Sequence, residues 1–523
     1  MFRSLASSLI TFFAVILFAF TILFLWSGSE GIQFARNDLN GDRSTQAVIA
    51  EFQAKQKAVA AATDYDRFDP DMETDVDEGD SNSGDGEPVV VWISIPGFRG
   101  DYVEKAETPF LDELISDGAE TNKMRPSFPC MTFPAHATMA TGMLPSQHGI
   151  VADRIRLPDG EVIKEPMNRE LLIAEPIWET ATRQGIKTLV HDWPLSQNQA
   201  GENAAAHFLP SFNPDSTDEE RLNQALETWR SASGGSAPAG DAPASDDVEM
   251  AEGDGEAMAP EGEPAAADPA TAEPAEAGGD KVRLVMLRLT DILKAGLVNG
   301  PREDATYEAI AKTDAALKAF FDKVQAEWAT LAPPNANLVI FISTDHGLAE
   351  LDKNVNVSQL LGDEMMQNAD IVAHDAIANL FFKDLPENEG EKKIFLDKFD
   401  GELSKRIYFR TIKKEELPEE WSYNHERTGD RVLVLKTGYS FVDETSDEPV
   451  FDPADGAGFF GGYGYPVDES IRMSGQVILS GIPNAPAYGD LGEIGQLSFH
   501  ATVCKLLGIQ PAEGAVTDTL ELN

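Results

Sequence analysis

The chain has 523 residues, of which 41 are basic and 89 acidic, and its formal net charge is -48. This length allows one large domain with appendages, and two cysteines, Cys130 and Cys504, exclude a disulfide-dense scaffold. The charge argues against a nucleic-acid partner and against adsorption to anionic lipid, because phosphate contacts need Lys and Arg.

Residues 1–30 are predicted to form a membrane anchor. The run Leu5–Trp26 holds no charged residue and has the length of one bilayer-spanning helix. Arg3 precedes this run and acidic sequence follows it, so the positive-inside rule places the bulk of the chain on the extracytoplasmic side, periplasmic or extracellular. Ser27–Ser29 imitates a signal-peptide cleavage site, which leaves a cleaved leader as the alternative.

Two acidic segments are predicted to be disordered. The first, Asp66–Glu87, carries ten acids and one base and ends the stalk and acidic linker of residues 31–87. Residues 231–280 carry thirteen acids, no base and no aromatic side chain. Neither segment can bury enough apolar surface to offset the entropy cost of ordering. The second is therefore expected to be an insertion within a domain that spans residues 88–523.

Buried apolar strands alternate with helices along that domain. The clearest elements are strands at Pro88–Ile95, Val282–Leu289 and Leu338–Ser343, and an amphipathic helix at Tyr307–Trp328. The helix pattern predicts that Asp314 and Lys318 face water. Alternating strands and helices indicate an α/β fold, a doubly wound sheet with helices on both faces.

Chemically useful residues come where the apolar runs end. Pro96–Arg99 breaks the first strand, Phe128–His136 contains Thr132, and Asp345–Gly347 ends a third apolar run. In open α/β sheets ligands bind at the carboxyl ends of the strands. Two further motifs follow along the chain, Thr141–Ile150 and the closing segment Phe499–Pro511. In their order, these sequence motifs resemble those of the type I phosphodiesterase and nucleotide pyrophosphatase family of the alkaline phosphatase superfamily.

The resemblance implies an alkaline-phosphatase-like fold and hydrolysis by two zinc ions with a hydroxyl nucleophile between them. Thr132 matches the nucleophile, at an expected helix start where free backbone N–H groups favour a phosphoryl group. Asp345 and His346 match an adjacent pair of ligands for one metal, and Asp291 matches the residue that opens the other metal's set.

Three of the six ligands that the resemblance implies are replaced. Pro96 stands in place of an Asp, Ala295 in place of a His four residues after Asp291, and Tyr463 in place of a late His. One carboxylate cannot hold zinc alone, so at most one zinc site is expected. A ligand from elsewhere in the chain, such as His374 or Asp375, is the route by which a site would be rebuilt.

Each candidate also has a structural interpretation. Thr132 could serve as a helix cap, Asp345 and His346 as a relic hydrogen-bonded pair, and Asp291 as a relic or a cap. Structural roles are favoured for three further residues, His136, His148 and the buried thiol Cys130.

Two functions follow from these observations. The first is a membrane-anchored pseudoenzyme or binding scaffold, whose partner is a phosphate-ester ligand or a protein. The second is an active metal-dependent phosphodiesterase or phosphatase that uses Thr132 with a reduced or rebuilt metal site. The replacements at Pro96, Ala295 and Tyr463 favour the first.

Overall fold

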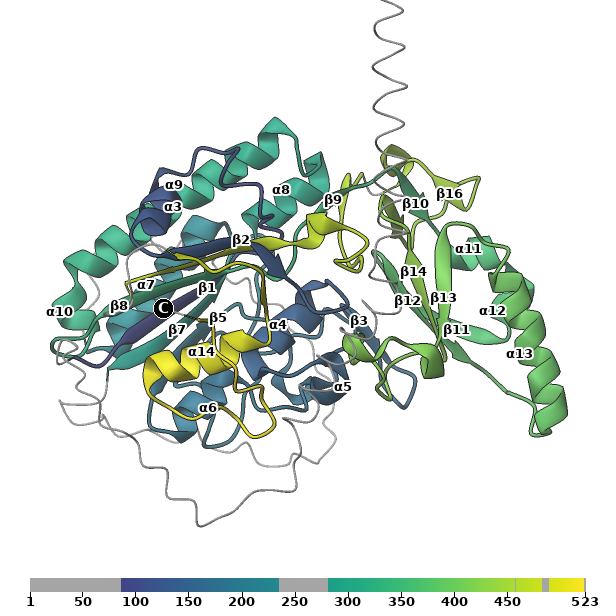
Figure 1. The fold of residues 1–523 in the computed structure, drawn as a ribbon, viewed down its shortest axis with the longest axis horizontal. Coiled ribbons are helices and arrows are strands. Elements are labelled where there is room, and N and C mark those ends of the chain that lie inside the picture. The colour runs from purple at the N-terminus through teal and green to yellow at the C-terminus, as the bar shows by residue number, and fades with distance from the viewer. Residues whose placement is uncertain (1–85, 235–280, 457, 482–488, 522–523) are drawn as a thin grey trace, which may run out of the picture. The chain divides into compact units, whose positions relative to one another are not determined.

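A mixed nine-stranded sheet forms the centre of the fold (Figure 1). The computed structural model describes residues 86–234, 281–456, 458–481 and 489–521. The strand order is β19-β2-β18-β8-β1-β7-β5-β6, and β20 pairs with β2. The strands are β1 (Val89–Ser94), β2 (Ala119–Arg125), β5 (Lys187–His191), β6 (His207–Phe208), β7 (Val282–Arg288), β8 (Leu338–Ser343), β18 (Gly475–Ser480), β19 (Gly489–Asp490) and β20 (Ile494–Gly495).

The parallel part of the sheet agrees with the predicted doubly wound core. β1 lies between β7 and β8, parallel to both, and β5 continues the parallel order beyond β7. Every residue of β1 is buried, as expected for a strand covered on both faces. β18 runs antiparallel to β8 and to β2, which makes the sheet mixed. This antiparallel part had no distinct signal in the sequence.

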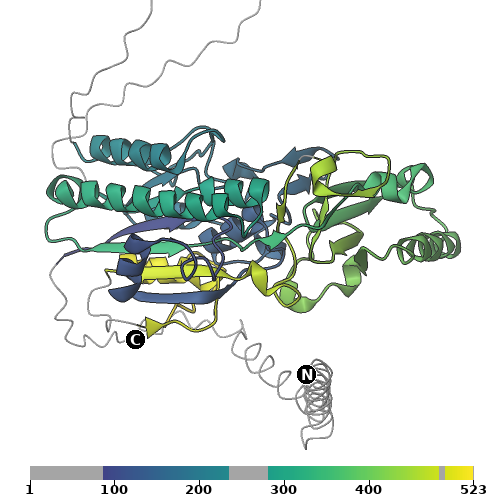
Figure 2. The ribbon, with the colours of Figure 1, turned by 90° about the horizontal axis from the view of Figure 1, so that it is seen from above.

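Helices cover both faces of the sheet (Figures 1 and 2). Val89, Val91 and Ile93 pack with α3 (Pro109–Ser116), α7 (Asp218–Ala232) and α9 (Asp304–Ala326), which is the long teal helix of Figure 2. The alternate residues Val90 and Trp92 pack with α4 (Thr132–Thr141), α6 (Ile177–Arg183) and α14 (Ser498–Leu507). The alternation follows from the two-residue period of a strand.

The predicted amphipathic helix exists, but one of its expected exposed residues is buried. The helix is α9, followed after Glu327 by the short α10 (Trp328–Leu331). Lys318 faces water as predicted. The prediction for Asp314 is wrong: its carboxylate is buried and accepts the backbone N–H groups of Phe110 and Leu111 at 3.2 and 2.9 Å. The first turn of α3 has unpaired N–H groups, and Asp314 satisfies two of them.

A second, four-stranded antiparallel sheet lies in the later part of the chain. Its order is β11-β12-β14-β13, from β11 (Ala369–His374), β12 (Ile377–Phe382), β13 (Phe409–Lys413) and β14 (Arg431–Leu435), accompanied by α11 (Val357–Leu361), α12 (Asp363–Met366) and α13 (Glu389–Leu403). One apolar cluster includes Leu380 and Val432 of this sheet together with Met131 and Phe133 beside α4. This packing brings the β11–β12 turn toward the start of α4.

Short elements complete the fold around these two sheets. They are α5 (Pro145–His148), α8 (Asp291–Asn299), the pairs β3 (Arg154–Arg156) with β4 (Val162–Lys164) and β9 (Ala349–Glu350) with β17 (Gly461–Gly462), and a small sheet of β10 (Lys353–Val355), β15 (Tyr439–Phe441) and β16 (Val450–Phe451). Several of these elements contribute residues to the candidate site.

The predicted anchor, stalk and acidic linker, and most of the predicted insertion, lie outside the described residues and stay predictions. The insertion boundary needs one correction. α7 continues to Ala232, and the hydroxyl of Ser233 donates to Leu331 O at 3.1 Å, so residues 231–233 belong to the folded domain. Lys281 Nζ donates to Ser233 O at 2.6 Å, which places the two ends of the insertion close together. Across the described ranges, none of the helices has the length and apolarity needed to cross a bilayer.

Candidate active site

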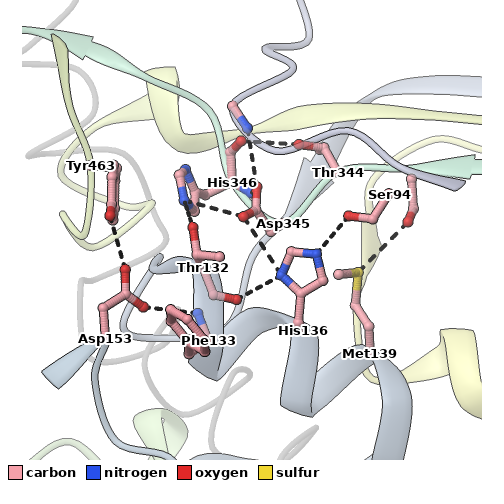
Figure 3. Close-up of polar contacts among 12 residues, drawn as sticks. Ser94, Thr132, Phe133, His136, Met139, Asp153, Thr344, Asp345, His346 and Tyr463 are labelled. Carbon is pink, nitrogen blue, oxygen red and sulfur yellow. Dashed lines mark hydrogen bonds and ion pairs between the residues drawn. The ribbon is translucent and has the colours of Figure 1, made fainter. Parts of the chain in front are cut away.

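Thr132 is the first residue of α4, as the sequence predicts, and follows the extended residue Met131. Its Oγ1 lies 3.2 Å from Nε2 of His346, the third residue after β8 (Figure 3). The fold therefore brings together the hydroxyl and imidazole of two sequence segments more than two hundred residues apart. The side chains of both residues are buried.

The hydrogen bonds fix the direction of this contact. Nδ1 of His346 lies 2.7 Å from Gly347 O, and a carbonyl can only accept, so Nδ1 carries a hydrogen. In the neutral ring Nε2 then accepts the hydroxyl hydrogen of Thr132. A hydroxyl that donates to an imidazole nitrogen is the arrangement in which a base activates a nucleophile.

Asp345 lies beside this pair, fully buried at the end of the apolar run. Its Oδ1 accepts the N–H groups of Gly97 at 3.1 Å and His346 at 2.6 Å, whereas Oδ2 is buried without a hydrogen-bond partner among the described residues. Burial by itself would raise the pKa of this carboxyl, but the charge of Arg288 and the N–H of Gly97 oppose it, and the pKa lies below its ordinary value. Asp345 therefore carries a negative charge at neutral pH.

The structure supports positioning roles for His136 and His148. Nδ1 of His136 donates to Thr132 O at 2.7 Å, and Nε2 accepts the Ser94 hydroxyl at 2.8 Å, which ties α4 to β1 (Figure 3). Nδ1 of His148 accepts the N–H of Ile150 at 3.1 Å in the following turn. Burial lowers the pKa of each imidazole to about 3, so both rings are neutral at physiological pH.

Tyr463, which replaces an expected His, is integrated into the site. Its ring stacks on the imidazole of His346 with centroids 4.3 Å apart and planes 20° apart. Its hydroxyl donates to Asp153 Oδ2 at 2.9 Å, while Asp153 Oδ1 accepts the Phe133 N–H at 2.8 Å (Figure 3). Burial raises the pKa of Asp153 to about 6 and raises that of the Tyr463 phenol well above its usual range.

Two glycines around Tyr463 hold its loop in place. A Cβ on Gly461 would stand 2.4 Å from Gly296 O of α8, so only glycine permits this approach of the two backbones. Gly464 has a positive φ of 89°, which favours glycine, and its N–H donates to Cys130 O at 2.8 Å. Gly461 and Gly462 form strand β17. The loop is thus fixed against α8 on one side and the Thr132 segment on the other.

Asp291 lies at the start of α8, where it takes part in reciprocal helix capping. Its Oδ2 accepts the N–H of Asp218 at 2.9 Å, and Oδ1 of Asp218 accepts the N–H groups of Thr290 at 2.6 Å and Asp291 at 3.1 Å. The starts of α7 and α8 thus share two carboxylates. Asp291 does not belong to the pocket lining that includes Thr132. The structure therefore gives it the capping role, and its role as a metal ligand stays a prediction.

A pocket of about 390 Å³ opens beside Thr132. His374 and Asp375, the two residues considered as relocated ligands, line it from the end of β11 and the turn that follows. Burial lowers the pKa of His374 to about 4 and raises that of Asp375 to about 7. Two further lining residues, Asp153 and Arg288, were missed from the sequence. Arg288 gave a usable signal, because a charged residue that directly follows the apolar stretch Leu284–Leu287 is uncommon.

The residues present do not fit a two-zinc centre. Thr132 Oγ1, His346 Nε2 and the orphaned Oδ2 of Asp345 converge, but Pro96, which directly precedes Gly97, has no ligand atom. Ala295 and Tyr463 supply no imidazole, and Asp291 is engaged at the helix starts. In the ranges that the structure covers, no group of three or more His, Cys, Asp or Glu side chains is arranged to hold a metal ion.

The site thus combines a helix-start threonine with an Asp-His pair that follows a strand of an α/β sheet. The family model for type I phosphodiesterase / nucleotide pyrophosphatase matches residues 90–463 of this chain. The chain belongs to that family, which fits within the alkaline phosphatase superfamily. The match runs from β1 to Tyr463 and so covers every segment of the site.

Known relatives agree with this assignment. An uncharacterized pyrophosphatase/phosphodiesterase of Schizosaccharomyces pombe is 26% identical over 387 residues, which is 71% of this chain and 68% of that protein. Human ectonucleotide pyrophosphatase/phosphodiesterase family member 1 is 34% identical over 128 residues, 23% of this chain but only 14% of the human one. The solved structure of murine ectonucleotide pyrophosphatase/phosphodiesterase 5 covers 81% of this chain and 96% of its own, with a TM-score of 0.59 and 20% identity. The last comparison shows a shared fold.

Proposed function

We propose that this chain is a membrane-anchored, extracytoplasmic protein that keeps the phosphodiesterase fold as a phosphate-ester-binding scaffold and hydrolyses its ligand poorly or not at all. The observation that carries the proposal is Tyr463. Its ring covers the imidazole of His346, and its hydroxyl is held by Asp153. Where the resemblance implies a metal-binding imidazole, the Tyr463 side chain instead packs on His346 and donates a hydrogen bond to Asp153.

The ligand class is suggested by the site and by a relative. Thr132 stands at a helix start and opens into the pocket, an arrangement that suits a phosphoryl group. An inactive form of murine ectonucleotide pyrophosphatase/phosphodiesterase 5 has been solved in complex with AMP; it covers 83% of this chain, with a TM-score of 0.61. A phosphate ester is therefore the first ligand to test.

An active enzyme is the second candidate function, and one contact favours it. Thr132 Oγ1 and His346 Nε2, 3.2 Å apart, form the pair that nucleophilic catalysis requires. On this alternative the chain would be a phosphodiesterase or phosphatase working with a reduced or rebuilt metal site.

Zinc content and hydrolysis distinguish the two functions. We expect the purified chain to hold fewer than two zinc ions, and its hydrolysis of bis(p-nitrophenyl) phosphate at pH 7–9 to match that of Thr132→Ala. Loss of one charge-stabilising partner costs roughly 3–4 kcal/mol in the transition state, and about 1.4 kcal/mol is tenfold in rate. Loss of the stabilising contacts at both metal positions would therefore remove nearly all hydrolytic activity.

Restoring the ligands provides the matched comparison. The triple variant Pro96→Asp, Ala295→His, Tyr463→His should gain zinc before it gains activity, because the segment after Asp291 also differs in length from the family pattern. If the native chain already holds two zinc ions and Thr132→Ala abolishes its turnover, the scaffold proposal fails and the enzyme alternative stands.

The anchor is tested separately, because Leu5–Trp26 lies outside the described residues. We expect the full chain to sediment with membranes, to resist extraction by high salt and alkaline carbonate, and to dissolve in detergent. Its N-terminal sequence should begin at or near Met1. Deletion of residues 1–30 should release it. A mature protein that starts near Glu30 and is soluble without detergent would instead show a cleaved leader.

A further inference from the structure

Arg288 places a buried guanidinium against the pocket that contains Thr132. It is the last residue of β7, is only 7% exposed, and lines the pocket. Its Nε is buried without a hydrogen-bond partner, and no ion pair or hydrogen bond to any described residue is found for its guanidinium. By contrast, the other two cations of the pocket are paired, Arg154 and Lys164 lying 2.8 and 3.5 Å from Asp443 Oδ2.

An unpaired buried charge is costly, so the surroundings of Arg288 matter. Burial lowers the pKa of its side chain, whereas the charges of Asp345, Asp192 and Asp153 raise it without direct contact. A guanidinium nevertheless stays protonated in proteins. The nearby carboxylates compensate its charge at a distance but leave its N–H donors unused.

Those carboxylates are either engaged by other protein groups or absent from the pocket lining. Asp192 forms a buried ion pair with Arg221. Both oxygens of Asp153 accept hydrogen bonds, from the Phe133 N–H and the Tyr463 hydroxyl. Asp345 is fully buried and does not belong to the pocket lining. At this wall of the pocket, the N–H groups of the Arg288 guanidinium are therefore available to donate hydrogen bonds to a ligand.

An aromatic ring lies beside the guanidinium of Arg288. The guanidinium carbon lies 5.3 Å from the centroid of the Phe212 ring, which also lies 4.7 Å from that of Arg221. Stacking on an aromatic face uses the flat side of a guanidinium and leaves its edge free for hydrogen bonds. An oxyanion with two oxygens fits that edge with two parallel bonds.

We propose that Arg288 makes this pocket a metal-independent binding site for a phosphate monoester. The phosphate would lie on the guanidinium edge beside the Thr132 hydroxyl, and the organic part would lie against the aromatic lining residues Phe133, Phe212 and Phe459. The proposal rests on the proposed function of a phosphate-ester scaffold and deepens it, because a protein cation takes over the anion contact that a metal would otherwise make.

Calorimetric titration of the full chain with phenyl phosphate and with inorganic phosphate tests this site. We expect phenyl phosphate to bind more tightly than inorganic phosphate, with the same affinity before and after treatment with EDTA. Arg288→Met should weaken binding at least tenfold, because charge-assisted bidentate hydrogen bonds are lost. Arg288→Lys, which keeps the charge but loses the fork, should fall between. Arg183→Met, which removes a cation paired with Glu175 outside this pocket, should change affinity less than twofold.

Several outcomes would overturn the proposal. They are binding that EDTA abolishes, binding that Arg288→Met leaves within twofold of the native value, and binding of inorganic phosphate that phenyl phosphate does not exceed. If Arg288→Met fails to fold, as judged by its melting curve, Arg288→Lys decides: unchanged affinity overturns the site. Hydrolysis of the ester is followed separately as release of phenol, so turnover would overturn the scaffold function without touching the assignment of Arg288.

Discussion

Replacing Asp192 by Asn is expected to lower the free energy of unfolding by roughly 3 kcal/mol. Asp192 and Arg221 form an ion pair in which both side chains are only 3% exposed, and the variant leaves the guanidinium buried without its counter-charge. Asn suits this position because residue 192 has a positive φ of 59°, which Asn tolerates. The measured loss therefore reports the charge rather than backbone strain. Urea unfolding followed by tryptophan fluorescence measures it.

A double variant and an exposed pair serve as controls. Asp192→Asn with Arg221→Met removes both charges and should be more stable than Asp192→Asn alone, because no unpaired guanidinium is then left buried. The exposed pair Lys398–Glu364 is joined at 3.2 Å with side chains 71% and 84% exposed. Glu364→Gln should change stability by less than ~0.5 kcal/mol. Equal effects at the buried and exposed pairs would contradict this account.

The pH dependence of stability should depend on Asp375. Burial, with a further contribution from the charge of Asp153, raises the pKa of Asp375 from its ordinary 3.8 to about 7. Between these values the folded chain holds a proton that the unfolded chain releases, so the contribution is present at low pH and is lost as pH rises through about 7. Asp375→Asn should therefore raise the melting temperature at pH 8 and flatten its fall between pH 5 and 8. The gain at pH 8 should be ~1–4 kcal/mol.

An exposed carboxylate serves as the control for Asp375→Asn, and a second buried carboxylate keeps part of the pH dependence in that variant. Asp447 lies exposed in a loop, and Asp447→Asn should leave the pH profile unchanged. Asp153, whose pKa burial raises to about 6, remains in the Asp375 variant and should preserve part of the slope. An Asp375→Asn profile that runs parallel to the native one from pH 5 to 8 would refute the assignment.

The sequence by itself determined the parallel core and the start of the site. β1 and β8 appear as nearly continuous apolar runs and β7 as a largely apolar one, because strands covered on both faces need mostly apolar residues. Thr132 at the beginning of α4, and Asp345 with His346 after β8, followed from the ends of these elements. The family assignment also came from the sequence, since it depends on the order of short sequence motifs along the chain.

Only the tertiary structure decided which of these side chains contact one another and which line the same pocket. Asp314 has the position of an exposed helix residue, yet it caps α3, because α3 packs against α9 and presents unpaired N–H groups there. Asp291, a predicted ligand, accepts the N–H of Asp218 at the start of α7, and its role as a ligand stays a prediction. Tyr463 and Arg288 lie far from Thr132 in the chain, and both border the same pocket through the packing of separate elements. Local pattern specifies the elements, whereas burial, pairing and pocket lining depend on contacts between residues hundreds of positions apart.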